Sequence, residues 1–153
     1  MDKDEQLRLD NQLCFAFYAC SKEITKLYRP ILAELGLTYT QYITLLSLWE
    51  QDKVTVKELG AKLSLDSGTL TPLLKKLEGM SLLTRIRDKS DERNVVIELT
   101  PQGQALRLRA IDIPARLFAD TNIEPTELLT LRDQIQALMR QLGTSNSPSA
   151  LDE

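Results

Sequence analysis

The stretch "TVKELGAKLSLDSGTLTPLLKKLE" (residues 55–78) decides the fold of this chain. Its first threonine stands three positions before Glu58, and this capping box predicts the start of a short helix. The polar break "SLDSG" then separates that helix from a second one. Because proline suits only the first turn of a helix, Pro72 places the expected cap of the second helix at Thr69 or Thr71. Two short helices joined by a tight turn predict a helix-turn-helix.

Downstream of this unit, the sequence predicts a hairpin followed by helices. Residues 82–100 contain two β-branched runs, "LLTRIR" and "NVVIELT", on either side of the polar connection "DKSDER". Thr100 and Pro101 provide a cap and a first helical position, and we expect the helix that they open to reach Phe118. Leucine and isoleucine at helical spacing predict a further helix over Pro125–Leu142.

Upstream, apolar residues recur every three or four positions over Leu9–Leu35, which predicts one amphipathic helix. Pro30 is expected to kink or restart this helix, and Gly36 suits its C-terminal end. Thr38 and Gln41 form a second capping box, which opens the helical stretch "TYTQYITLLSLWE".

This order of elements predicts a mainly α fold with a small β-hairpin wing, a winged helix-turn-helix, in a single domain over residues 1–153. The DNA-binding module is expected at 38–100, and the tail 143–153 is expected to be disordered. The helices at 9–35 and 101–142 carry more apolar surface than so small a module can cover. Burial of that surface against a second copy predicts a homodimer.

Composition narrows the possible functions. No apolar run is long enough to span a membrane, and the charged start "MDKDEQLRLD" does not look like a secretory signal. Two cysteines without a pairing partner suit the reducing cytoplasm, and the absence of histidine leaves no metal site and no expected cofactor. The net charge is −3, whereas residues 54–100 carry eight basic and seven acidic side chains, with the basic ones concentrated over 75–93.

Both cysteines lie in "NQLCFAFYAC" (residues 11–20). Six helical residues span roughly 9 Å, and a disulfide needs Cα atoms within about 7 Å, so Cys14 and Cys20 cannot pair within one helix. Cys20 lies on the apolar stripe of the helix and is expected to be a small buried core residue. Cys14 is turned about 100° away, onto a flank rich in hydroxyl groups. It is therefore the candidate reactive thiol, although inert packing remains open.

These motifs resemble a known family. "DERNVVIELTPQG" is similar to the wing signature of MarR-type regulators, with matching spacing at Asp91, Arg93, Ile97, Leu99, Thr100 and Gly103. The stretches "LDNQLCFAFYA", "TKLYRPILAELGLTYTQY" and "LDSGTLTPLLKKLE" resemble the OhrR-type organic hydroperoxide sensors within that family. Together the matches cover most of residues 9–118. Ser64 departs from the tyrosine that close relatives often carry.

The resemblance implies that Cys14 is the peroxide-reactive residue and that Tyr28 and Tyr39 hydrogen-bond its sulfur. Tyr28 follows Cys14 by fourteen residues, roughly 21 Å along a straight helix, so we expect the tyrosines to come from the partner chain. The alternative is that both rings merely pack with their polar tips exposed. No cysteine follows Cys20, so the chain resembles the one-cysteine type, whose sulfenic acid condenses with a low-molecular-weight thiol.

For a double-stranded DNA operator, the helix that begins around Ser67 to Thr71 is expected to enter the major groove. The candidate DNA contacts are Ser67, Thr69, Thr71, Lys75, Arg85, Arg87 and Arg93. Ser67, Thr69 and Thr71 have an alternative role: at least one of them is expected to cap the helix rather than contact DNA. An ion pair with Asp91 that shapes the wing is the alternative for Arg93, and both roles are compatible.

The sequence thus predicts a redox-sensing repressor that binds a palindromic operator when reduced and is released when organic hydroperoxide oxidises Cys14. One alternative is a MarR-type repressor that binds a small aromatic ligand, with Cys14 unreactive. A thiol peroxidase is disfavoured because the chain has no histidine, so no enzymatic activity is expected.

Overall fold

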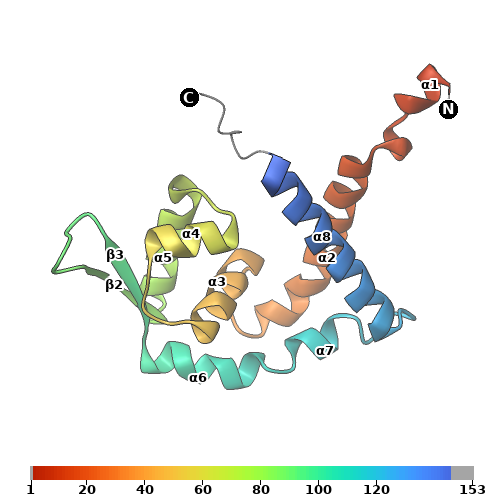
Figure 1. The fold of residues 1–153 in the computed structure, drawn as a ribbon. Coiled ribbons are helices and arrows are strands. Elements are labelled where there is room, and N and C mark those ends of the chain that lie inside the picture. Colours follow the sequence, from red (N-terminus) through yellow and green to blue (C-terminus); the bar gives the residue numbers. More distant parts are fainter. Residues whose placement is uncertain (1, 146–153) are drawn as a thin grey trace, which may run out of the picture. The chain divides into compact units, whose positions relative to one another are not determined.

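The computed structural model describes residues 2–145 (Figure 1). The chain divides into two compact units, Met1–Leu117 and Phe118–Glu153. The elements of the first unit are α1 (Lys3–Gln6), the 3-10 turn η1 (Leu9–Asn11), α2 (Leu13–Ala33), α3 (Tyr39–Glu50), β1 (Val54–Thr55), α4 (Val56–Leu63), α5 (Ser67–Gly79), β2 (Leu83–Arg87), β3 (Val95–Leu99), α6 (Pro101–Ala110) and α7 (Ile113–Leu117). The second unit contains α8 (Pro125–Ser145).

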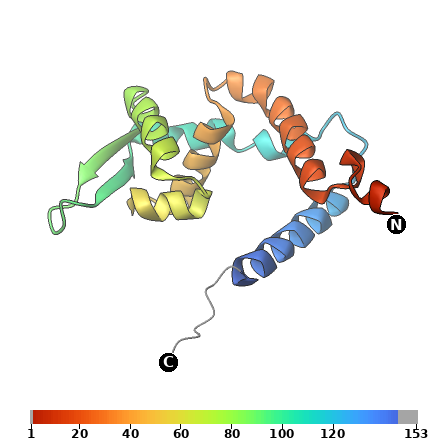
Figure 2. The same cartoon turned by 90° about the horizontal axis from the view of Figure 1, so that it is seen from above.

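The winged helix-turn-helix predicted from the sequence is confirmed. β2 and β3 form the antiparallel hairpin, which projects beyond α4 and α5 (Figures 1 and 2). β3 is the central strand of the sheet, because the two-residue strand β1 pairs with its other edge. The sequence did not predict β1, which is too short to show an alternating pattern.

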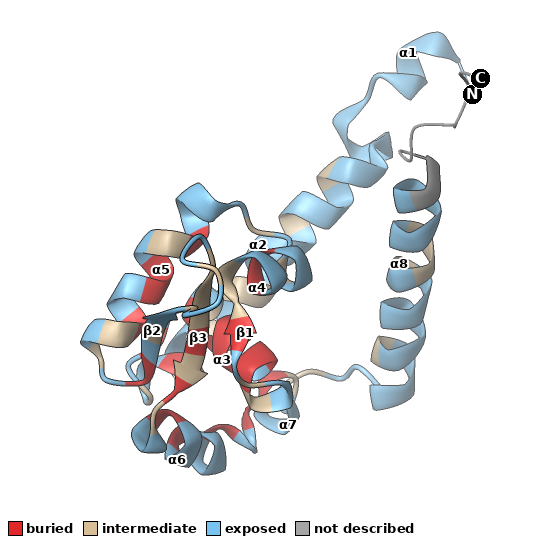
Figure 3. Ribbon diagram, turned by 60° about the vertical axis from the view of Figure 1, so that its left-hand side comes forward, coloured by how far each residue is buried: buried red, intermediate tan, exposed pale blue. Residues whose placement is uncertain are grey.

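One hydrophobic core holds the module together. Its leucines recur on α5 at helical spacing, so that a single stripe of this helix is buried. Figure 3 shows the buried residues gathered around the sheet, α3 and α5. The core includes Leu45, Leu48, Leu59, Leu70, Leu74, Leu77 and Ile97.

Local hydrogen bonds confirm three helix starts expected from the sequence. Thr38 and Thr55 form capping boxes with Gln41 and Glu58. Thr100 accepts from the backbone N–H of Gly103, with Pro101 at the first helical position. Gly103 also lies so close to the carbonyl oxygen of Leu82 that a Cβ atom would overlap it, which explains glycine at this place in the wing motif.

The expected helix over residues 9–35 is wrong at its start. The chain makes the turn η1, passes through an extended Gln12 and begins α2 only at Leu13. The side-chain amide of Gln12 donates to the backbone carbonyls of Gln6 and Arg8, and that of Asn11 donates to Glu5. These bonds satisfy carbonyl groups that a continuous helix would have used. Pro30 does not restart α2, which continues through it to Ala33.

For the second helix of the helix-turn-helix, the expected cap at Thr69 or Thr71 is also wrong. α5 is capped by Asp66, whose carboxylate accepts from the backbone N–H of Thr69 at 2.7 Å. Pro72 has no N–H for the carbonyl of Gly68, but the buried leucines Leu70, Leu73, Leu74 and Leu77 lie on both sides of it, and their burial together with the Asp66 cap offsets the missing bond.

The single helix expected from Pro101 to Phe118 is broken into α6 and α7. Pro114 has no N–H to donate to the carbonyl of Ala110, and the break between α6 and α7 coincides with this missing hydrogen bond. α8 extends to Ser145, beyond the expected end at Leu142. The rest of the predicted tail, residues 146–153, lies outside the described residues. The single-domain assignment and the dimerisation roles of 9–35 and 101–142 stay predictions.

Candidate functional site

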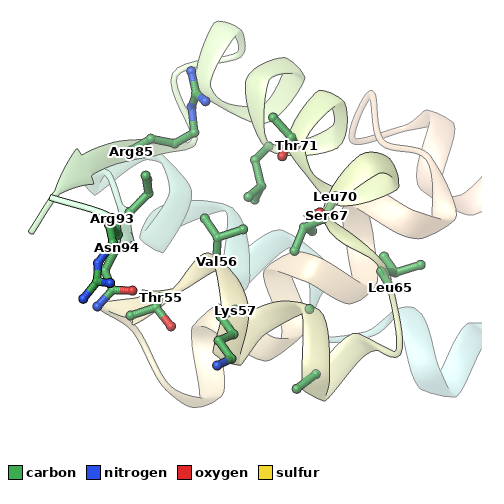
Figure 4. Close-up of a pocket in the computed structure, with 14 residues that line it drawn as sticks. Thr55, Val56, Lys57, Leu65, Ser67, Leu70, Thr71, Arg85, Arg93 and Asn94 are labelled. Atoms are coloured by element: carbon green, nitrogen blue, oxygen red, sulfur yellow. The ribbon is translucent and has the colours of Figure 1, made fainter. Parts of the chain in front are cut away.

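A pocket of about 470 Å³ opens between α4, α5 and the hairpin (Figure 4). Four of the predicted DNA contacts line it: Ser67, Thr71, Arg85 and Arg93. Thr55, Lys57 and Asn94 also line it, although the sequence analysis did not single them out as DNA contacts. The fold therefore brings side chains of the helix-turn-helix and of the wing to one concave surface.

The three remaining candidates lie outside this pocket. Thr69 and Lys75 are exposed on α5, and Arg87 is exposed at the end of β2, where it donates to the carbonyl of Glu92 at 3.1 Å. Hydrogen bonds from Thr69 hold the pKa of Asp66 below its usual value. The backbone N–H of Thr69 is thus engaged with the helix cap, which is Asp66 and none of the three hydroxyl residues.

Arg85 has a structural partner that the sequence analysis missed. Its backbone N–H donates to Glu78 at 3.0 Å, and its Nε and Nη2 donate to the other oxygen of the same carboxylate at 3.2 and 3.1 Å. These hydrogen bonds lower the pKa of Glu78. The pair ties the end of α5 to β2, so the guanidinium of Arg85 is already engaged within the chain. Opposite charges seven residues apart across the helix–strand turn were the available signal.

At the wing tip, Arg93 and Asp91 form the expected ion pair. Nε and Nη2 of Arg93 donate to the two carboxylate oxygens at 3.0 and 3.1 Å, and its backbone N–H adds a bond at 3.1 Å. These contacts lower the pKa of Asp91. The Arg93 side chain is nevertheless 90% exposed. Asp91 therefore fixes the direction of an arginine that remains open to a ligand.

Cys14 is the second residue of α2 and is exposed. Neither cysteine forms a disulfide, in agreement with their position on one helix. The expectation that Cys20 is buried is wrong for the single chain, where Cys20 is exposed too. Its apolar neighbours on the same stripe of α2 are exposed as well: Leu13 is 61% exposed, and Phe17 is also exposed.

Three phenol rings cluster where α2 meets α3. The ring of Tyr28 lies 5.0 Å from that of Tyr39 and 5.7 Å from that of Tyr42, measured between centroids. Burial, together with the neighbouring phenols, raises the pKa of Tyr28 to about 12, so its hydroxyl is a donor throughout the neutral range. Within residues 2–145, none of the three hydroxyls has a hydrogen-bond partner.

The chain does not bring Cys14 to these tyrosines. Cys14 and Tyr28 lie near opposite ends of the same helix, fourteen residues and roughly 21 Å apart. Tyr39 is in contact with Tyr28 and so belongs to the far end as well. The predicted contact between the thiol and the phenols is thus not made within one chain.

Among the described residues, no group of His, Cys, Asp and Glu could hold a metal ion. Likewise, none of the described helices is both long and apolar enough to cross a membrane.

A wing, a recognition helix and a concave surface between them define a winged helix-turn-helix DNA-binding protein. The family model described as transcriptional regulator SarA/Rot matches residues 26–107. The organic hydroperoxide resistance transcriptional regulator of Bacillus subtilis (strain 168) is 44% identical over 95% of this chain and 99% of its own length. The regulator SarZ of Staphylococcus aureus (strain USA300) is 47% identical over 80% of this chain and 83% of its own length.

Solved structures of DNA-binding regulators are also similar to this chain. Reduced AbfR bound to DNA has a TM-score of 0.81 and 36% identity, and the match covers 95% of this chain and all of that one. AbfR of Staphylococcus epidermidis has a TM-score of 0.73 and 35% identity, covering 92% and 98% of the two chains. The chain belongs to the MarR-type transcriptional regulators, in the branch of organic hydroperoxide sensors, as its motifs indicated.

Proposed function

We infer that this chain is a redox-sensing transcriptional repressor that binds a palindromic operator when reduced and is released when an organic hydroperoxide oxidises Cys14. The name of the Bacillus relative supports this class of oxidant, and DNA-bound structures of reduced and overoxidised AbfR support coupling of DNA binding to thiol state. Induction by a small aromatic ligand is not favoured by these relatives. The protein acts in the cytoplasm and is not an enzyme, since each oxidised thiol leaves it in the released state.

The observation that carries the proposal is the separation of the thiol from the phenols. Cys14 is exposed at one end of α2, and the hydroxyls of Tyr28 and Tyr39 have no partner within residues 2–145 at the other end. A homodimer in which α2 of one protomer meets the phenols of its partner completes both halves. It also covers the apolar side chains exposed on α2, among them Leu13 and Phe17.

The chemistry follows from the thiolate as nucleophile. Its sulfur attacks the terminal oxygen of the hydroperoxide, the S–O bond forms, the O–O bond breaks, and the alkoxide leaves with a proton taken from its surroundings. The resulting sulfenic acid condenses with a low-molecular-weight thiol to give a mixed disulfide and water. The adduct is too bulky for the space where Tyr28 and Tyr39 had packed.

Release follows from geometry. In the reduced dimer, α5 of each protomer enters the major groove, with Ser67, Thr71 and Lys75 along one face, and Arg93 reaches the minor groove. Arg85 acts through its bond to Glu78, whereas Arg87 contacts the phosphate backbone. An adduct at Cys14 shifts the α2 helices, so that the two α5 helices no longer match the half-site spacing.

The test is operator binding by reduced protein, measured at one stated salt concentration before and after stoichiometric cumene hydroperoxide with a small thiol. Wild type and Cys20→Ser should both release the operator, whereas Cys14→Ser should hold it. Cys20→Ser is the matched control because both thiols lie exposed on α2. Release by Cys14→Ser would contradict the proposal.

A further inference from the structure

Tyr42 is a member of the phenol cluster that the sequence analysis did not single out. It lies one turn after Tyr39 on α3, and its ring is in contact with that of Tyr28. Only 1% of Tyr42 is exposed, less than either neighbour. Its ring is therefore part of the core of the module, while its position on α3 places it beside both candidate donors to the sulfur.

The hydroxyl of Tyr42 has no acceptor among the described residues. No hydrogen bond from it exists within residues 2–145, although buried tyrosine hydroxyls usually find a partner. Yet no fully buried polar side-chain atom of the described residues is unsatisfied. The small exposed part of Tyr42 must then include its hydroxyl oxygen. A core ring thus presents one unpaired donor at the surface of the phenol cluster.

The peroxide reaction has a place for a third donor. Two hydrogen bonds to the sulfur stabilise the thiolate, but negative charge also develops on the oxygen that leaves when the O–O bond breaks. Tyr39 and Tyr42 are three residues apart on one helix, so their side chains share a face and are offset by about 4.5 Å along its axis. A donor offset in this way from Tyr39 suits an oxygen that lies beyond the sulfur.

We propose that Tyr42 is the third donor of the peroxide site and hydrogen-bonds the departing oxygen of the hydroperoxide. This inference rests on the proposed function, with Cys14 supplied by the partner. As the sulfur–oxygen bond forms, the leaving alkoxide accepts the Tyr42 proton and departs as an alcohol, and the phenolate is reprotonated by water. The sulfur is oxidised by two electrons and the peroxide is reduced by two.

The test uses full-length Tyr42→Phe, which keeps the ring and removes only the hydroxyl. The rate constant for oxidation of Cys14 is measured with tert-butyl hydroperoxide, whose alkoxide leaving group needs a proton, and with peracetic acid, whose carboxylate leaving group does not. The variant should react about tenfold more slowly with the alkyl hydroperoxide and within about twofold of wild type with the peracid. Tyr28→Phe, which weakens the thiolate itself, should slow both oxidants.

The ratio of the two rates in one sample does not depend on the fraction of folded protein, so partial unfolding of the variant does not obscure the result. An equal slowing with both oxidants, or no slowing with either, would overturn the role of Tyr42. The proposed function fails separately, if Cys14→Ser still releases the operator after oxidation.

Discussion

The DNA-reading module and the thiol-bearing half of α2 differ in how complete they are within one chain. In the module, Leu70, Leu74 and Leu77 are at most 1% exposed, and the ion pair of Glu78 with Arg85 ties α5 to β2. In the first turns of α2, Leu13 is 61% exposed and Cys14 is open to solvent. Figure 3 shows the same contrast. The DNA-binding module is complete when one chain folds, whereas the thiol-bearing half of α2 stays exposed to solvent.

The largest effect on stability is expected from the core of the DNA-binding module. Leu77→Ala removes a completely buried side chain and should lower the free energy of unfolding by about 2–5 kcal/mol at any protein concentration. Leu13→Ala should act through the dimer instead, so its effect on the melting temperature should shrink as the protein is diluted and the dimer dissociates. Thermal melts over a range of concentrations separate the two. If Leu13→Ala lowered the melting temperature equally at all concentrations, the proposed difference between the two regions would be contradicted.

Loss of a phenol hydroxyl should slow oxidation of Cys14 without changing operator binding by the DNA-binding module. Tyr28→Phe removes one proposed hydrogen bond to the thiolate and should slow Cys14 oxidation by about ten- to a hundredfold. Stopped-flow kinetics with cumene hydroperoxide measures the rate, and titration of the operator checks that the affinity of the reduced protein is unchanged. Unchanged kinetics would favour the alternative in which the ring merely packs.

Within the DNA-binding module, the two arginines of β2 should differ in their effect on the salt dependence of operator binding. Arg87 is exposed, and Arg87→Ala should reduce the slope of log affinity against log salt by about 1. Arg85 is held by Glu78, so Arg85→Ala and Glu78→Gln should weaken operator binding by a similar factor and leave the slope unchanged. Fluorescence anisotropy at several salt concentrations measures the slopes. If Arg85→Ala also reduced the salt slope by about 1, this would show that Arg85 itself contacts phosphate.

The smallest effect is confined to alkaline pH. The folded chain raises the pKa of Tyr28 from 10.0 to about 12, so it holds this proton more tightly than the unfolded chain. The resulting stability is complete below pH 10 and is lost as the pH rises through about 12. Tyr28→Phe should therefore flatten the fall in unfolding free energy across this range, and the exposed Tyr18→Phe should not. Identical slopes in denaturant titrations of wild type and Tyr28→Phe would refute this.

The sequence predicted those features that depend on neighbouring residues. The caps at Thr38, Thr55 and Thr100 need only a few residues, and the hairpin needs only its two β-branched runs. The capping of α5 by Asp66 was missed because Pro72 suggested a later start, whereas burial of the α5 leucines on both sides of Pro72 keeps this residue within the helix.

The site was harder to predict, because its contacts join distant parts of the chain. Motifs singled out Cys14, Tyr28 and Arg93, but the bond between Glu78 and Arg85 depends on how α5 turns into β2. The contact of Tyr42 with Tyr28 depends on how α2 packs on α3. Neither packing angle can be read from residue spacing.

The central claim, that the thiol and the phenols meet across two protomers, is tested most directly with mixed dimers. A Cys14→Ser chain paired with a Tyr28→Phe chain leaves one Cys14, which faces the intact Tyr28 of its partner. Wild type paired with the double variant also leaves one Cys14, which faces Phe in place of Tyr28 on its partner. The oxidation rate of that single thiol should match wild type in the first dimer and the slow Tyr28→Phe protein in the second. The reverse result would place both groups within one chain and contradict the account.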